Sequence, residues 1–314
     1  MKILVTGAAG FIGSHMCEGL AAMGHQVIGV DNFSPYYDPE LKRLNARDIE
    51  AKGVVLIEAD LVNDLDQVLP SDIDVIYHFA AQPGISATTP FTEYERNNIV
   101  ATQNLLQWAI TTNAHTQHFV NIATSSIYGI HAVSTEDEAP QPVSDYGVTK
   151  LAAEQLVLAA QRTAKISACS VRLFSVYGPR ERPEKLYTKL IKSIYQQKEF
   201  PLYEGSEKHQ RSFTYVGDIV AGLAAILNNV ARCDGQIINL GSTRVNTTAE
   251  GIALIEKITG KKARLKRVPQ RPGDQLKTAA TIAKAKAILG YTPSTSFEDG
   301  LKAQVAWYWS KFGQ

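Results

Sequence analysis

Tyr146 and Lys150 are the residues of this sequence best suited to proton chemistry. They open a predicted helix four residues apart, so the phenol and the ammonium project from one helical face. A nearby ammonium favours the phenolate and lowers the pKa of a tyrosine, which makes the phenol a proton acceptor near neutral pH. The same spacing is common on solvated helices. Thr124 makes a catalytic role for the pair more specific, because it follows the apolar run His118 to Ala123, which reads as a strand. Hydroxyls at the carboxyl end of a strand face the ligand crevice of α/β proteins.

A glycine-rich loop near the N-terminus supplies further context. Lys2 to Thr6 reads as a buried strand, an amphipathic helix follows the loop, and a second apolar run ends in an acidic residue. This order is typical of a dinucleotide-binding unit. Gly7 makes the tight turn off the strand, Gly10 lets the backbone approach a pyrophosphate, and Gly13 lets helix and strand pack closely. The pyrophosphate then meets free N–H groups at the helix N-terminus.

Two carboxylates refine the prediction of the cofactor. Asp31 can accept hydrogen bonds from both hydroxyls of an adenosine ribose and would repel a 2′-phosphate, and no arginine directly follows it. NAD is therefore favoured over NADP, with an NADP-dependent sugar reductase as the disfavoured alternative. Asp60 follows a third expected strand, Val54 to Glu58. It either meets the amino group of the adenine or caps a helix, and the sequence leaves both roles open.

The first half of the chain alternates strand and helix, which predicts right-handed crossovers and a parallel sheet. A long helix is expected from about Thr92 to Thr112. After Arg172 strands and helices no longer alternate regularly, and loops rich in proline, glycine and arginine follow. A length of 314 residues suits one large α/β domain over residues 1–172 and a smaller one mainly over residues 173–314. Segments near residues 213–240 are expected to return to the main sheet.

Composition excludes several other classes of protein. The formal net charge is +1, which implies no nucleic-acid-binding surface. No apolar run reaches membrane-spanning length, and the chain starts directly with a strand, so neither a membrane span nor a signal peptide is expected. Cys17, Cys169 and Cys233 are far apart in apolar runs. They are interpreted as buried thiols of a cytoplasmic protein, with no disulfide and no metal site.

Eight stretches together carry a family resemblance: TGAAGFIGSH, VDNFS, HFAAQPG, ATSSIYG, YGVTK, RLFSVYGPRERP, RSFTYVGD and INLGS. With them the chain resembles the extended short-chain dehydrogenases/reductases, specifically the nucleotide-sugar epimerases. The stretch DNFSPYYDPELKRLN is similar to the uronic-acid 4-epimerase branch. The resemblance implies a Rossmann-type doubly wound parallel sheet with a smaller C-terminal substrate-binding α/β domain. It also implies NAD as cofactor, a UDP-sugar as substrate and a homodimer built from paired helices.

The resemblance also assigns roles to residues. Thr124, Tyr146 and Lys150 take the places of the catalytic hydroxyl residue, the base and its partner. Asn98 matches an asparagine that props the active-site helix. With it, the expected cofactor site comprises Gly7, Gly10, Phe11, Ile12, Gly13, Asp31, Asn32, Asp60, Leu61, Ala80, Ala81, Asn98, Tyr146 and Lys150.

Arginines are expected on the substrate side. Arg211 and Arg271 match diphosphate contacts of the family, and guanidinium binds a diphosphate in bidentate fashion. Arg182 either faces the sugar or forms a surface ion pair. Two departures concern the sugar: Ser86 stands where related epimerases often carry arginine, and Ser212 stands where they carry an acid.

The hydroxyl residues next to Thr124 discriminate among the reactions of the family. A 4,6-dehydratase needs an acid and a base at the positions of Ser125 and Ser126, and a uronic-acid decarboxylase carries glutamate at the second. An epimerase needs no additional acid. Ser125, Ser126 and Ser175 are expected to hold the carboxylate of a 4-keto uronate, although Ser126 and Ser175 would serve equally as strand caps. The favoured reaction is C4 epimerisation of UDP-glucuronate. The alternatives are a UDP-glucose/galactose 4-epimerase, then a decarboxylase or dehydratase, and a non-catalytic nucleotide sensor.

Overall fold

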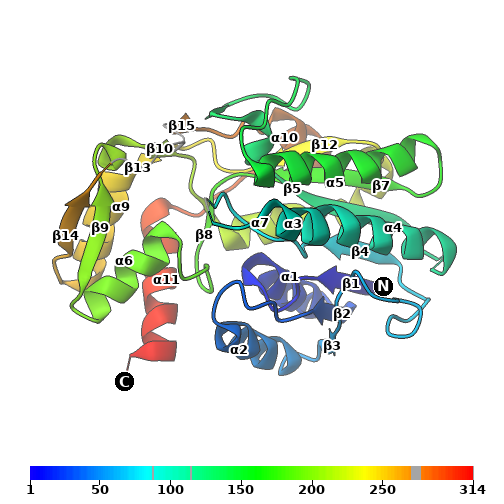
Figure 1. Ribbon diagram of the computed structural model, residues 1–314, viewed down its shortest axis with the longest axis horizontal. Coiled ribbons are helices and arrows are strands. Elements are labelled where there is room, and N and C mark those ends of the chain that lie inside the picture. Colours follow the sequence, from blue (N-terminus) through cyan, green and yellow to red (C-terminus); the bar gives the residue numbers. More distant parts are fainter. Residues whose placement is uncertain (87, 114, 270–276, 314) are drawn as a thin grey trace.

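Seven parallel strands form the central sheet of the computed structural model, which describes residues 1–86, 88–113, 115–269 and 277–313 (Figure 1). Their order across the sheet is β12-β7-β5-β4-β1-β2-β3, and all the pairings are parallel. This sheet confirms the predicted Rossmann-type α/β fold. The strands are β1 (Lys2–Thr6), β2 (Gln26–Asp31), β3 (Val55–Glu58), β4 (Val75–His78), β5 (His118–Thr124), β7 (Ala168–Leu173) and β12 (Ile237–Leu240).

The strand order reverses between β1 and β4. From β1 the chain builds outward through β2 and β3, then crosses back to place β4 on the other side of β1, with Thr6 opposite His78. In open parallel sheets, ligands bind in the crevice at the carboxyl ends of the strands where the order reverses. The glycine loop after β1 and the loop after β4 both lie at this point.

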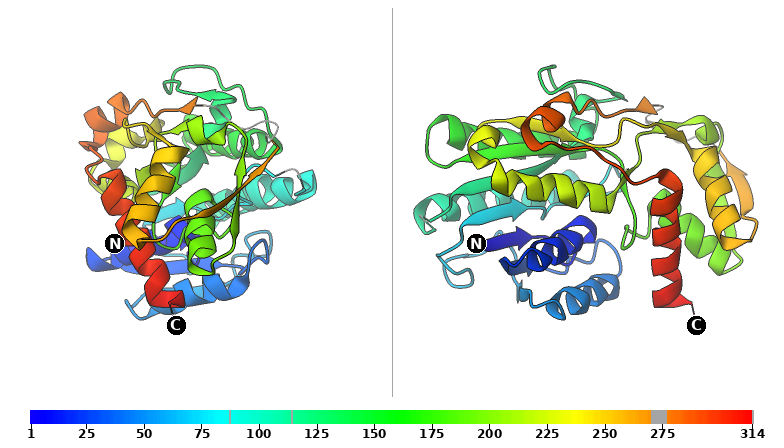
Figure 2. Two further views of the ribbon diagram at one scale, coloured as in Figure 1. Left: turned by 90° about the vertical axis from the view of Figure 1, so that its left-hand side faces the viewer. Right: turned by 180° about the vertical axis from the view of Figure 1, so that it is seen from behind.

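Helices cover both faces of the sheet (Figures 1 and 2). Side chains of a strand alternate between faces, so Ile3 and Val5 pack on one core and Leu4 on the other. The first core lies under α1 (Phe11–Ala22) and α7 (Val216–Ala224), and the second lies under α4 (Ala101–Thr111) and α5 (Asp145–Arg162). The helix α2 (Pro39–Glu50) follows β2 and starts at the cap residue Asp38.

The long helix expected from Thr92 to Thr112 is divided. α3 (Phe91–Tyr94) runs into the π-helix η1 (Glu95–Val100), and α4 follows directly. The sequence shows no helix-ending signal at this point, because a π-turn accommodates an extra residue without ending the helix. Single π-turns occur frequently at functional sites, and this one contains Asn98.

The C-terminal elements form a separate lobe, at the left of Figure 1. Its core includes Tyr187, Leu190, Ile255 and Leu301. It is built from α6 (Leu186–Tyr195), β9 (Glu199–Tyr203), α9 (Thr248–Thr259), β14 (Arg264–Val268) and α11 (Phe297–Phe312). Within this lobe, α11 is the helix on the side of the main sheet (Figure 2). The chain returns to the first core of the main sheet with α7, and β12 then pairs with β7 at the edge of that sheet.

Short elements connect the two parts. The β strands among them pair in small sheets beside the crevice. The connecting elements are η2 (Ser125–Tyr128), β6 (His131–Ala132), β8 (Val176–Tyr177), η3 (Ser206–Lys208), β10 (Gln210–Arg211), β11 (Thr214–Tyr215), β13 (Asn246–Thr247) and β15 (Lys277–Thr278). Three other short elements pack on the first core of the main sheet: η4 (Ala225–Asn228), α8 (Val230–Cys233) and α10 (Ala283–Leu289).

All three cysteines, Cys17, Cys169 and Cys233, are buried free thiols, as predicted. Within the described part of the chain, no helix combines the length and apolar character needed to cross a membrane.

Candidate active site

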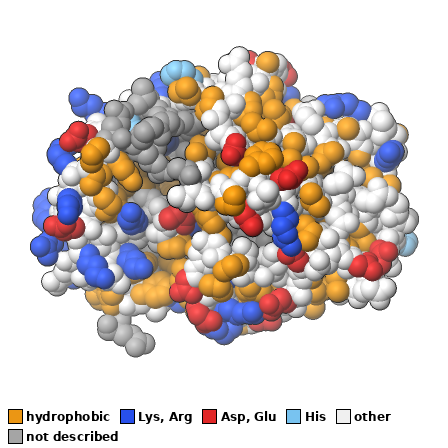
Figure 3. Space-filling view, in the orientation of Figure 1, with side chains coloured by type: hydrophobic (Ala, Val, Ile, Leu, Met, Phe, Trp, Pro, Cys, Tyr) orange, Lys and Arg blue, Asp and Glu red, His pale blue; other side chains and the backbone are white. Residues whose placement is uncertain are grey.

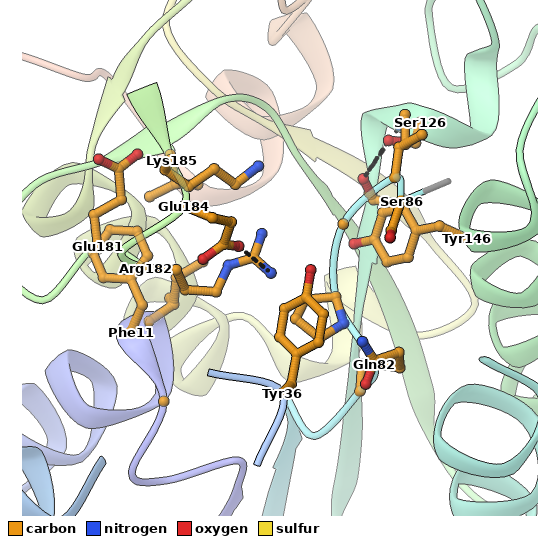
Figure 4. Close-up of a pocket in the computed structure, with 18 of the residues that line it drawn as sticks. Phe11, Tyr36, Gln82, Ser86, Ser126, Tyr146, Glu181, Arg182, Glu184 and Lys185 are labelled. Atoms are coloured by element: carbon orange, nitrogen blue, oxygen red, sulfur yellow. Dashed lines mark hydrogen bonds and ion pairs between the residues drawn. The ribbon is translucent and has the colours of Figure 1, made fainter. Parts of the chain in front are cut away.

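A cavity of about 1070 Å³ occupies the crevice and extends into the C-terminal lobe (Figure 4). It collects most of the residues that the sequence singled out. Asn98 is absent from its wall, and Arg271 lies outside the described residues. The predicted site residues that line it are Gly7, Gly10, Phe11, Ile12, Gly13, Asp31, Asn32, Asp60, Leu61, Ala80, Ala81, Thr124, Ser125, Ser126, Tyr146, Lys150, Ser175, Arg182 and Arg211.

The glycine loop forms a cradle that side chains would fill. Gly7 has a φ of +67°, and a Cβ there would lie 2.9 Å from the backbone nitrogen of Ala80. A Cβ on Gly13 would strike the carbonyl oxygen of Gly7, so this glycine lets α1 approach the end of β1. Gly10 is the N-cap of α1 and provides no side-chain cap. The first-turn amides therefore stay available to an anion, and the cradle fits the pyrophosphate of a dinucleotide.

Asp31 closes the cradle at the end of β2. Its carboxylate accepts hydrogen bonds from the N–H groups of Ala9 at 3.0 Å and Phe33 at 2.8 Å. Burial raises the pKa of Asp31, whereas the charge of Lys42 and the two N–H groups oppose that rise. A carboxylate has about four acceptor positions, so two remain for ribose hydroxyls.

Asp60 caps a turn and not a helix, and its contact with the adenine stays a prediction. It lines the cavity, and its carboxylate also accepts the N–H of Val62 at 3.2 Å in the turn after β3. Arg96 and Asn32 donate to it at 2.8 and 3.1 Å. Burial raises the pKa of Asp60, but these two hydrogen bonds outweigh burial, and the pKa falls below its ordinary value.

The elements β5 and α5 bring the expected catalytic groups together. α5 starts after Ser144, whose hydroxyl accepts the N–H of Gly147 at 3.2 Å. Tyr146 lies in the first turn, and its side chain hydrogen-bonds with Thr124 at the end of β5. Lys150 follows one turn later and is only 3% exposed. A phenol, a hydroxyl and an ammonium thus share one wall of the cavity.

The pKa of Tyr146 is raised in the folded chain, so the predicted lowering is wrong. Burial raises the pKa of Tyr146, and what opposes this rise is the hydrogen bond with Thr124 and the charge of Arg182. Burial also lowers the pKa of Lys150 to about 8, against the charge of Glu154. The physical reason is that burial penalises every charged form, phenolate and ammonium alike.

Asn98 lies behind the cavity wall and is fully buried. Its Oδ1 accepts the N–H of Gln82 at 2.7 Å, and its Nδ2 donates to Oγ1 of Thr149 at 3.0 Å. Gln82 is in the loop after β4, and Thr149 is in α5. Asn98 therefore occupies the position of a prop, as the resemblance implied, and not that of a direct cofactor contact.

Ser125, Ser126 and Ser175 add neutral hydroxyl groups to the wall of the cavity. Ser125 and Ser126 begin η2, and Oγ of Ser126 lies 3.3 Å from Oγ1 of Thr124. Ser175 has a φ of +29°, and its Oγ lies 3.3 Å from Oγ1 of Thr278. Non-glycine residues with such strained backbones cluster at functional sites. Ser126 and Ser175 thus do more than end strands, because both also face the cavity.

The arginines line the cavity from the C-terminal lobe. Arg182 pairs with Glu184 at 3.1 Å and is 12% exposed at its side chain. Arg182 therefore forms an ion pair and also lines the cavity, and its contact with the sugar stays a prediction. Arg211 is in β10 and also lines the cavity.

Several lining residues escaped the sequence interpretation. Tyr36 and Lys42 belong to the stretch DNFSPYYDPELKRLN. Asp38 and Pro39 in this stretch are typical of a helix start, and this signal could have placed Lys42 in the first turns of α2. Glu181 is buried, accepts hydrogen bonds from Thr188 and Gln304, and burial raises its pKa to about 7. No motif marks it. The missed residues are Tyr36, Tyr37, Lys42, Gln82, Glu181, Glu184, Lys185 and Tyr187.

Comparisons with known proteins agree with this geometry. Residues 3–241 match the NAD dependent epimerase/dehydratase family. The chain is 39% identical to an uncharacterized UDP-glucose epimerase, YtcB, of Bacillus subtilis over 98% of each chain. It is 35% identical to UDP-glucuronate 4-epimerase 5 of Arabidopsis thaliana, over 98% of this chain and 75% of that one.

Solved structures give the same result. The UDP-glucuronic acid 4-epimerase of Bacillus cereus, in complex with UDP-glucuronic acid and NAD, matches with a TM-score of 0.93 at 37% identity. The match covers 99% of this chain and 100% of that one. The chain therefore belongs to the NAD-dependent epimerase/dehydratase family.

Proposed function

We propose that this protein is an NAD-dependent 4-epimerase that interconverts UDP-glucuronate and UDP-galacturonate. The observation that carries the proposal is the set of side chains at the end of β5. Thr124 and Tyr146 are hydrogen-bonded there, and their neighbours Ser125 and Ser126 are neutral. The end of β5 thus offers a base for the sugar hydroxyl, and the described residues next to Thr124 include no acid for dehydration or decarboxylation.

The chain's own residues would handle the proton and the orientation of the ligands. When bound, NAD would supply the redox chemistry: a hydride acceptor for C4 of the sugar and, once reduced, a hydride donor for the other face. Tyr146 accepts the O4 proton, and Thr124 orients the phenol through their hydrogen bond. Lys150 stabilises the phenolate as it forms and holds the nicotinamide ribose. General-base catalysis of this kind contributes about 10²–10⁴-fold.

A 4-keto uronate is a β-keto acid and tends to lose carbon dioxide. We propose that Ser125, Ser126 and Ser175 hold its carboxylate through neutral hydroxyl groups. Such donors fix the carboxylate while its charge is retained, which disfavours the loss of carbon dioxide. A negatively charged neighbour would instead repel the carboxylate.

The distribution of charge supports an anionic substrate. Residues 173–314 contain 22 Lys and Arg against 12 Asp and Glu, whereas residues 1–172 contain 10 against 19. Lys and Arg side chains are numerous over the C-terminal lobe, at the left of Figure 3. A cleft with one positive wall attracts anions. We propose that Arg211 and Arg271 bind the diphosphate and that Arg182 faces the sugar.

A UDP-glucose/galactose 4-epimerase is the second candidate. Two observations favour it: the 39% identical relative is named a UDP-glucose epimerase, and the charge of Arg182 is already paired with Glu184. The deciding experiment incubates the protein with NAD and, separately, UDP-glucuronate, UDP-glucose and UDP-galactose, and follows the stereochemistry at C4 by NMR. We expect turnover of UDP-glucuronate to exceed that of the hexoses. Turnover of the hexoses alone would replace the uronate assignment by the second candidate.

We also propose a homodimer that works in the cytoplasm. Phe91, Val100 and Val148 are 46, 47 and 46% exposed, and they lie on the helices that the resemblance pairs between subunits. The free thiols fit a reducing compartment. Light scattering is expected to give a dimer for the parent and a monomer for Val148→Glu. A monomeric parent at micromolar concentration would contradict the proposal.

A further inference from the structure

Tyr36 and Arg182 meet across the cavity from opposite parts of the chain. Tyr36 is in the loop between β2 and α2, five residues after Asp31, and Arg182 is in the loop between β8 and α6. The two side chains hydrogen-bond. The guanidinium carbon also lies 5.8 Å from the centre of the tyrosine ring. Figure 4 shows the Tyr36 hydroxyl pointing toward the guanidinium.

A third loop supports this contact. Gly84 follows β4, and a Cβ there would lie 3.3 Å from Nη2 of Arg182 and 3.7 Å from the hydroxyl of Tyr36. Its φ of +83° favours glycine. The hydroxyl of Tyr94 donates to the carbonyl of Gly84 at 2.7 Å and holds the loop in place. The Tyr36–Arg182 contact, called the bridge below, thus packs against the loop after β4.

Arg182 has donor capacity beyond the bridge. Its side chain is 12% exposed, and Nη1 pairs with Glu184 at 3.1 Å without hydrogen-bond geometry. A guanidinium has five N–H donors in a rigid fork, so two partners do not exhaust it. The bridge therefore fixes the plane of a cation that lines the cavity.

We infer that Tyr36 is a positioning residue, which holds Arg182 across the cavity and thereby keeps the 4-keto sugar bound until it is reduced. The inference rests on the proposed function. An epimerase must let the 4-keto sugar rotate inside the site, so that the ketone presents its other face, without releasing it. Tyr36 belongs to the loop after Asp31 and Arg182 to the loop before α6, so their contact links the two sides of the cavity that they line.

Early loss of the ketone has defined products. The sugar leaves as the 4-keto uronate, and the two electrons stay on the enzyme as reduced nicotinamide. The released β-keto acid then loses carbon dioxide: the bond from C5 to the carboxylate breaks, its electron pair forms the C4 enolate, and a solvent proton at C5 gives the 4-keto pentose. Each such event is counted by the absorbance of the reduced cofactor and by the pentose in the NMR spectrum.

The test compares three variants. Tyr36→Ala removes the bridge, Tyr36→Phe removes only the hydroxyl, and Tyr195→Phe is the control, since Tyr195 packs on Tyr308 and Trp309 outside the cavity wall. The quantity measured is the number of aborted turnovers per epimerisation. It is independent of the amount of folded protein. We expect a rise of about fivefold for Tyr36→Phe, the worth of one hydrogen bond, a larger rise for Tyr36→Ala, and no change for the control.

A second measurement needs no turnover. In a Tyr146→Phe background, UDP-glucuronate dissociation is followed by stopped-flow fluorescence, and Tyr36→Ala is expected to accelerate it. Unchanged values in both measurements would overturn the inference about Tyr36. A parent that turns over only UDP-hexoses would instead refute the proposed substrate, and the bridge is then tested in the same way with that hexose.

Discussion

Nδ2 of Asn98 donates a hydrogen bond to Oγ1 of Thr149 over 3.0 Å, and this bond joins the π-turn of η1 to the helix that carries Tyr146 and Lys150. The same amide group also holds both the N–H and the C=O of Gln82. One buried side chain therefore sets the distance between the loop after β4 and the catalytic helix.

Replacing Asn98 by alanine should weaken both stability and turnover. The buried N–H of Gln82 loses its partner, which costs about 1–3 kcal/mol of the free energy of unfolding. Urea denaturation and turnover number are the measurements. Gln103→Ala is the matched control, because Gln103 is exposed on the neighbouring helix α4. A variant as stable and as active as the control would contradict the role of Asn98 as a prop.

Gly10→Val should abolish tight NAD binding. A Cβ at Gly10 lies 3.0 Å from the carbonyl oxygen of Gly7, and the larger side chain would occupy the pyrophosphate cradle. We expect the affinity for NAD, measured by calorimetry, to fall by more than about tenfold, which corresponds to 1.4 kcal/mol. Gly260→Asn is the control: the position is left-handed, which asparagine tolerates, and a Cβ there meets nothing within 4 Å. Equal affinity in the Gly10 variant would refute the assignment of the loop.

The sequence predicted those parts of the site that depend on local chain geometry. The glycine cradle, Asp31 at a strand end and the Tyr146–Lys150 pair all follow from short-range spacing, and the structure places them along one cavity. Contacts between distant segments left no such pattern. The Tyr36–Arg182 bridge joins residues from separate loops.

The charges of the site were the least predictable part. Spacing showed that Lys150 shares a face with Tyr146, but the pKa of each group depends on how deeply the folded chain buries it. The π-turn around Asn98 could not be predicted from the sequence either, since the apolar pattern continues through it into α4.

Tyr146→Phe should lower turnover by about 10²–10⁴-fold while NAD affinity survives, because the phenol is the proposed acceptor of the O4 proton. Lys150→Ala should lower turnover and also weaken NAD binding, since the lysine is proposed to serve phenolate and ribose. Thr124→Ala should cost less than either. Steady-state kinetics and NAD titration on the three variants are the measurements. A Tyr146→Phe variant with parental turnover would remove the tyrosine from the mechanism.

The buried ammonium of Lys150 should make stability depend on pH. Burial lowers the pKa of Lys150 to about 8, from an ordinary value of 10.5. Between these values the unfolded chain binds a proton that the folded chain does not, so this group makes the free energy of unfolding rise with pH. Below pH 8 the folded chain bears the full cost of the buried charge.

The comparison with Lys150→Met isolates that contribution. We expect the variant to be more stable than the parent at neutral pH, and its advantage to shrink as the pH rises from 8 to 10.5. Urea denaturation across this range measures the difference. A constant difference would mean that Lys150 titrates at its ordinary pKa in the folded chain.

Ser126→Glu tests which group of the sugar faces the serines. If the carboxylate of the uronate lies there, a glutamate repels it, weakens UDP-glucuronate binding and destabilises the charged 4-keto acid, so that remaining turnover shifts towards the pentose. Ser126→Gln has the same size without the charge, and it should weaken binding less and give no added pentose. NMR of the products with both variants separates charge from size. If Ser126→Glu epimerises UDP-glucuronate as well as the parent and forms no pentose, Ser126 does not face the carboxylate, and the hydroxyls at the end of β5 bind a neutral part of the sugar.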